Sequence, residues 1–198
     1  MSTDNVDTRR RRFLVNSTSV VAAVGAGFVA VPFLSSWMPS ERAKNAGAPV
    51  EVDISKLEEG RMMIVEWQSK PVWIVKRSAK TLSDLVSLDG NLRDPASENI
   101  DQQPAYAQNA NRSIKPEIVV LVGICTHLGC SPTFRPDIAA ADLGADWLGG
   151  FFCPCHSSKF DLAGRVYQGV PAPTNLAVPP HKYLSDNVIL VGEDEGAA

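Results

Sequence analysis

Cys125-Thr-His127-Leu-Gly-Cys130 and Cys153-Pro-Cys155-His156-Ser-Ser158 are the two stretches that decide the interpretation of this chain. We call them string one and string two. All four cysteines and two of the three histidines lie in them. One cysteine and one histidine from each string can together hold a metal centre, and the second cysteine of each string can then bridge the two loops. This pattern predicts a redox metalloprotein.

Two kinds of metal site fit this spacing. Tetrahedral zinc held by two cysteines and two histidines is common, and spacing alone leaves it open. In Rieske iron–sulfur centres two histidines replace two cysteines on one iron, so that Cys125 and Cys153 would bind one iron and His127 and His156 the other. Zinc does not account for the extra cysteine pair and the N-terminal segment together. His181 has no cysteine nearby, and we expect it to be solvated or at the edge of the core.

Composition limits the class of protein. The chain has 198 residues, 44% of them hydrophobic, which is enough for one core with a small inserted subdomain. The formal net charge is -3, and no basic stripe follows the first dozen residues, so nucleic acid is not an expected partner. Four clustered cysteines indicate a metal site rather than a disulfide scaffold.

The N-terminal segment is directed to a membrane. Four arginines, Arg9 to Arg12, precede a run without charge that ends before Glu41. A helix over residues 13–38 would measure roughly 39 Å against a hydrocarbon core of about 30 Å, so we expect a single-pass anchor. Arginines stay in the cytoplasm, which puts residues 1–12 there and the rest of the chain across the cell inner membrane, in the periplasm.

The same arginines resemble the twin-arginine export signal, used by proteins that fold around a cofactor before export. A cleaved signal peptide is the alternative, and Ala46-Gly47-Ala48 offers a cleavage site. On either interpretation the folded part meets an oxidising compartment, in which a disulfide persists.

The rest of the chain predicts a mostly β protein. Residues 39–49 are polar and small with a proline at each end, and we expect a flexible tether there. The folded domain then covers residues 50–198. One helix is expected over 81–88, and residues 91–116 are expected to form a long surface excursion. Strands of an antiparallel sheet are expected at 50–54, 62–67, 72–76, 117–124, 149–153, 165–168 and 187–191.

The chain resembles the Rieske iron–sulfur subunits of bacterial ubiquinol–cytochrome c reductase, the cytochrome bc-type complex. The likeness runs over nearly the whole length and is carried by the arginine-led anchor, the stretch 46–57, both strings and Gly169-Val-Pro-Ala-Pro173. It implies an antiparallel β-sandwich with a small cluster-binding subdomain over about 119–173, and one [2Fe-2S] cluster. It also implies the site residues: Cys125, His127, Cys153 and His156 as ligands, Cys130 and Cys155 as a disulfide, Ser158 as a donor to the cluster, and Leu128, Gly129, Pro171, Ala172 and Pro173 as a docking tip.

The resemblance also implies a function. The cluster would take one electron from ubiquinol and pass it to a c-type cytochrome, while a cytochrome b subunit takes the second, and the complex would be dimeric. The outer ring nitrogen of His156 would bind the quinol. Negative charge gained on reduction favours protonation of this imidazole, so one contact would receive both electron and proton. The alternative functions are a Rieske subunit of another periplasmic or plastoquinol redox complex, or a membrane-anchored structural zinc module.

Two positions depart from the family pattern. Ser157 stands where relatives usually have glycine, which matters if the loop needs a positive φ there. Phe160 stands where many relatives have a tyrosine that donates to a cluster cysteine. Loss of that donor predicts a lower reduction potential.

Overall fold

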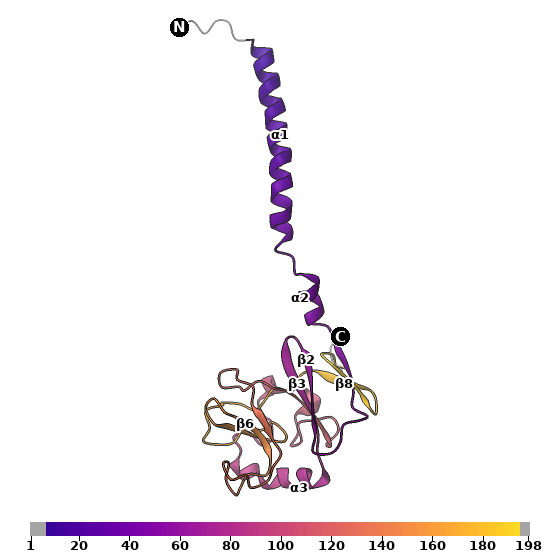
Figure 1. Ribbon diagram of the computed structural model, residues 1–198, viewed down its shortest axis with the longest axis vertical. Helices are drawn as coiled ribbons and strands as arrows, with labels where there is room; N and C mark the ends of the chain where they lie inside the picture. The colour runs from indigo at the N-terminus through magenta and orange to yellow at the C-terminus, as the bar shows by residue number, and fades with distance from the viewer. Residues whose placement is uncertain (1–6, 195–198) are drawn as a thin grey trace. The chain divides into compact units, whose positions relative to one another are not determined.

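A computed structural model describes residues 7–194 of the chain, which divide into an N-terminal unit ending at Asn45 and a second unit beginning at Ala46. The helices and strands of both units are shown in Figure 1.

The N-terminal unit is dominated by α1 (Thr8–Ser35), a helix with no buried residue. Asp7 caps it, because its carboxylate accepts hydrogen bonds from the backbone N–H of Arg9 and Arg10 at 3.0 and 3.2 Å. Helix α1 is long and apolar enough to cross a membrane, with a mean hydropathy of 1.8 over its best window. It begins earlier than the expected residue 13 and includes the four arginines, since Asp7 starts the helix before them.

A short second helix, α2 (Glu41–Ala46), lies within the stretch expected to be a flexible tether. Lys44 and Glu41 form an ion pair at 2.7 Å on its exposed surface. The polar and small residues of this stretch predicted irregular structure. Glu, Lys and Ala are good helix formers, however, and the Glu41–Lys44 ion pair adds to the stability of the helix.

The second unit contains three antiparallel sheets of three strands. The first has the order β1 (Val50–Asp53), β9 (Val188–Val191), β8 (His181–Ser185). The central sheet has the order β2 (Met62–Trp67), β3 (Lys70–Lys76), β4 (Ile118–Val122). The third has the order β5 (Thr133–Arg135), β6 (Gly150–Cys153), β7 (Ser158–Asp161). The mostly β, antiparallel fold expected from the sequence is confirmed.

The central sheet is buried on both faces. Side chains alternate between the faces of a strand, and β3 uses both sets. Val72 and Ile74 pack in a core with residues of β1 and β9, whereas Trp73 and Val75 pack in a second core with Phe151 of β6. The sheets that hold β8 and β6 accordingly flank the β2 and β3 strands in Figure 1. This two-sided burial explains the continuous apolar runs of β3 and β4.

Several expected elements differ from the structure. Helix α3 (Ala79–Ser87) matches the expected helix within two residues, but residues 165–168 form only two isolated bridges, through Val166 and Tyr167. The sequence does not predict strands β5, β7 and β8, because they contain polar and charged residues and few β-branched ones. Strand β4 belongs to the central sheet, so the third sheet begins later than residue 119.

The segment 91–116 lies at the surface with many exposed residues, as expected, but it is also anchored in the domain. Besides part of one 3₁₀ turn (Asp89–Asn91) and two more (Ile100–Gln102 and Ala105–Ala107), it contains side chains that are buried in the domain. Leu92, Ala107 and Arg112 are at most 2% exposed. Its many Asn, Gln and Pro residues predicted exposure to solvent. Several of its polar side chains instead form hydrogen bonds within the fold, with backbone carbonyls or with another side chain.

Candidate metal centre

String one is a closed loop that leaves the end of β4. The Cys125 N–H donates to the Cys130 carbonyl at 2.7 Å, and the Gly129 N–H donates to the Cys125 carbonyl at 3.0 Å. Gly129 has a φ of 84°, which a side chain would make costly. These bonds turn the chain back at once, so that Leu128 projects at the tip with 71% exposure.

String two is the hairpin turn between β6 and β7. Cys153 ends β6, Ser158 begins β7, and the two residues are register partners in the sheet. The Ser157 N–H closes the turn by donating to the Cys153 carbonyl at 2.9 Å. The turn therefore presents Cys155 and His156 outward, and both are exposed.

The four cysteines have two different roles. A disulfide joins Cys130 of string one to Cys155 of string two, with their Cα atoms 6.7 Å apart. Cys125 and Cys153 are free and buried. The Cys153 sulfur lies within 4.8 Å of both disulfide sulfurs, but a disulfide carries no thiolate charge, so that trio is not a ligand set. The two free thiols are the sulfur donors that remain.

Burial raises the pKa of the Cys125 thiol, and the adjacent Cys153 thiol raises it further. The backbone N–H of His127 and the hydroxyl of Ser158 act in the opposite direction. Two buried thiolates side by side would repel each other in a low dielectric. A bound cationic centre that takes both sulfurs as thiolates removes this cost, so the pair suits a metal.

The two histidines meet on the outer side of the strings. The ring centroids of His127 and His156 lie 4.7 Å apart at an interplanar angle of 87°. His127 is half-buried and His156 is exposed, whereas the two free cysteines are buried. This donor set, with two sulfurs inside and two imidazoles outside, fits a [2Fe-2S] group with unlike irons.

The proline loop, residues 169–173, is tied to both strings. The Thr126 hydroxyl donates to the Thr174 carbonyl at 2.7 Å, and the Ala172 N–H donates to the Ser158 hydroxyl oxygen at 3.1 Å. Ala172 is buried, while Pro171 and Pro173 are exposed. Pro171, Pro173 and Leu128 are therefore exposed apolar residues on the loops that carry the candidate site.

The structure thus brings the expected site residues together from three loops. Thr126 was missed in the sequence, although a hydroxyl residue between a cysteine and a histidine of string one was a visible signal. His181 lies elsewhere, at the start of β8, where its N–H donates to the Tyr106 hydroxyl oxygen at 2.8 Å. It is 1% exposed rather than solvated, and burial lowers its pKa.

Ser157 has a φ of 61°, the left-handed conformation that glycine adopts without cost. We expect Ser157→Gly to raise the free energy of unfolding by about 1 kcal/mol, since that conformation costs about 1 to 2 kcal/mol for other residues. Chemical denaturation of the disulfide-intact protein measures this. Ser185→Gly is the control, because Ser185 is an exposed strand residue without positive φ, and it should be neutral or destabilising. A Ser157→Gly protein no more stable than the parent would contradict the strain.

Comparison with known proteins agrees with this geometry. Residues 50–180 match the family model of the Rieske [2Fe-2S] domain, and residues 1–40 match the model described as "Ubiquitinol-cytochrome C reductase Fe-S subunit TAT signal". The ubiquinol-cytochrome c reductase iron-sulfur subunit of Allochromatium vinosum is 60% identical over 100% of this chain and 95% of its own length.

Two further relatives span most of the chain. The ubiquinol-cytochrome c reductase iron-sulfur subunit of Blastochloris viridis is 38% identical over 96% of this chain and 97% of its own length. The mitochondrial Rieske subunit of the Candida albicans cytochrome b-c1 complex is 39% identical over 91% of this chain and 75% of its own length. With its two free cysteines, paired imidazoles and disulfide-joined loops, the chain belongs to the Rieske [2Fe-2S] family of ubiquinol–cytochrome c reductase iron–sulfur subunits.

Proposed function

We propose that this chain is the electron-transfer subunit of a ubiquinol–cytochrome c reductase, which takes one electron from ubiquinol and passes it to a c-type cytochrome. The observation that supports this best is the pairing of buried sulfur donors with outward imidazoles at an apolar tip, in a chain 60% identical to such a subunit. The enzyme class is that of a quinol-oxidising oxidoreductase complex.

The residues that would hold the [2Fe-2S] cluster are Cys125 and Cys153 on the inner iron and His127 and His156 on the outer iron. When bound, the cluster supplies a one-electron acceptor of raised potential. Ser158 can donate its hydroxyl proton toward the sulfurs, because its oxygen already accepts from the Ala172 N–H.

His156 is our choice for the contact with quinol. Its side chain is exposed at the tip, and a ring nitrogen that faces outward can accept a hydrogen bond from a quinol hydroxyl and then hold its proton. Leu128, Pro171 and Pro173 are exposed apolar residues on the site loops, and they would exclude water from a docked contact. The tip would therefore dock against an apolar quinol pocket of a cytochrome b subunit.

The N-terminal unit would anchor the subunit. Helix α1 would cross the cell inner membrane once, with Arg9 to Arg12 on the cytoplasmic side and the domain in the periplasm. Residues 39–49, including α2, would connect anchor and domain and let the domain move between quinol and a c-type cytochrome. The assembled complex would be dimeric.

The direct test is purification of the full chain from membranes. We expect two irons and two acid-labile sulfides per chain, a reduced-state electron spin resonance signal, and cytochrome b and a c-type cytochrome in the same particle with inhibitor-sensitive quinol oxidation. Stoichiometric zinc in place of iron would refute the proposal. His156→Ala should abolish the signal, whereas His181→Asn should keep it, since His181 lies in β8 and not in either string.

Ser158→Ala removes the hydroxyl donor and should lower the reduction potential. One hydrogen bond of about 1 kcal/mol corresponds to roughly 40 mV for a one-electron couple. Protein-film voltammetry of the soluble domain or the whole complex measures the shift. The control is Ser131→Ala, an exposed serine just beyond string one. An equal or higher potential in Ser158→Ala would contradict this role.

Phe160 is fully buried in the same apolar core as Cys125 and Cys153. Phe160→Tyr adds a hydroxyl that can donate to a cysteine sulfur, so we expect the potential to rise by roughly 40 mV, again one hydrogen bond. Voltammetry at constant pH is the measurement. Phe152→Tyr, on the neighbouring strand and half-buried, is the matched control and should leave the potential unchanged. The idea fails if Phe160→Tyr leaves the potential unchanged or lowers it.

A further inference from the structure

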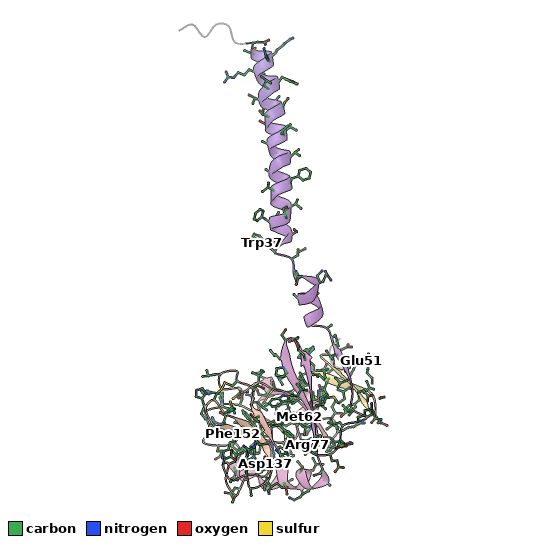
Figure 2. All side chains as sticks on the ribbon, viewed as in Figure 1. Trp37, Glu51, Met62, Arg77, Asp137 and Phe152 are labelled. Atoms are coloured by element: carbon green, nitrogen blue, oxygen red, sulfur yellow. A yellow bond between two sulfur atoms is a disulfide. The ribbon has the colours of Figure 1, made fainter. Side chains whose placement is uncertain are left out.

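Three buried arginines hold the turn that follows β7, residues 161–165. Arg77 is 2% exposed, and Arg112 and Arg165 are fully buried. Together they bind every residue of the turn except Arg165 itself. Arg77 donates to the Leu162 carbonyl at 3.3 Å, and Arg112 donates to the carbonyls of Ala163 and Gly164 at 3.2 and 3.4 Å. Arg77 is labelled among the side chains of the second unit in Figure 2.

Arg165 is neutralised locally. Its Nε donates to the buried carboxylate of Asp161 at 2.7 Å, and a second nitrogen donates to Asp89 at 2.8 Å. A buried ion pair of this kind has little net charge at a distance. Arg165 therefore stabilises the turn, and its charge has little electrostatic effect at a distance.

Arg77 and Arg112 differ, because all of their hydrogen-bond acceptors are neutral. Besides the turn, Arg112 donates to the Gln102 carbonyl and the Gln103 side-chain oxygen. Arg77 donates to the Asn111 and Pro116 carbonyls and to the Ser113 hydroxyl. Within residues 7–194, the Nε atoms of both arginines are buried without a partner.

Both side chains nevertheless keep their charge. Burial lowers the pKa of Arg77 and of Arg112 to about 10, and Asp161 offsets part of that effect for each. Both guanidinium groups are thus protonated at neutral pH. Asp161, which is bonded to Arg165, faces both guanidinium groups. Glu117 also faces Arg77 and Asp94 also faces Arg112, but Glu117 is exposed and Asp94 is half-buried, so water screens these two carboxylates more than it screens the buried arginines.

Strand β7 joins the turn that these arginines hold to the metal centre. Strand β7 runs from Ser158, the register partner of Cys153, to Asp161 at the turn. Three residues of strand span about 10 Å. The path runs through an apolar core that contains Cys125, Cys153 and Phe160, where charges are weakly screened. Reduction adds one negative charge to the centre, and a nearby cation stabilises that state more than the oxidised one.

We propose that Arg77 and Arg112 raise the reduction potential of the Rieske centre through their buried charges, which donate hydrogen bonds to neutral acceptors, in addition to holding the 161–165 turn. The proposal rests on the cluster and not on the identity of the quinol or the acceptor. Neither arginine touches the strings, so their effect is electrostatic and acts at a distance.

The test compares variants that remove charge with variants that remove only a hydrogen bond. Arg112→Met removes the guanidinium, whereas Gln103→Leu removes one of its acceptors and leaves the charge. For the other arginine, Arg77→Met removes the charge and Ser113→Ala removes one hydrogen-bond acceptor. At a fixed electrode potential, each Arg→Met variant should show an at least threefold lower ratio of reduced to oxidised cluster, which is about 28 mV for a one-electron couple. Gln103→Leu and Ser113→Ala should lower the melting temperature and leave the ratio within that limit.

Arg61→Met, at an exposed position, controls for surface charge and should leave the ratio unchanged. The inference is overturned if the Arg→Met variants keep an intact cluster spectrum with an unchanged ratio. It is also overturned if the hydrogen-bond variants lower the ratio as much as the Arg→Met variants do. If Arg112→Met does not fold, the Arg77 pair decides. Absence of a cluster from the parent protein would instead overturn the proposed function.

Discussion

The Cys130–Cys155 disulfide is the constraint on which the site depends. It joins a loop at the end of the central sheet to a hairpin turn of the third sheet, two segments separated by 25 positions in the chain. Once those two cysteines are bonded to each other, only Cys125 and Cys153 remain as thiols, and both are buried. The covalent link therefore decides which sulfurs are available as ligands and holds the two histidines within ring contact.

The disulfide works because the sheets beneath it are already in place. Trp73 of β3 stacks on Phe151 of β6 with ring centroids 4.7 Å apart, which joins the central sheet to the third sheet. Gly123 is required at this junction, because a Cβ there would lie 2.2 Å from the Trp73 ring. The chain then leaves β4 directly into string one. Close packing and the absence of a side chain at Gly123 thus set the direction in which string one leaves the sheet, and hydrogen bonds from Thr126 to Thr174 and from Ala172 to Ser158 connect the strings to the proline segment.

The charged groups that stabilise the domain and the loops that carry the candidate site lie at opposite ends of strand β7. Charged groups needed for folding, such as Asp161 and Arg165, pair with each other inside the domain at the far end of β7. The two strings and the proline loop, by contrast, contain no Asp, Glu, Lys or Arg. The proposed contact with quinol would therefore require no such charge to be desolvated.

Local chemistry in the sequence determined the class of site, the ligand residue types, the apolar helix and most of the longer strands, because cysteine spacing and side-chain periodicity are short-range signals. Residue order alone did not show that Ser157 adopts a positive φ, that Thr126 binds Thr174 beside the proline loop, or that segment 91–116 buries Leu92, Ala107 and Arg112. Only the tertiary structure decided these. These features depend on contacts between residues far apart in the chain, such as Arg112 with Gly164. Such contacts cannot be predicted from local composition.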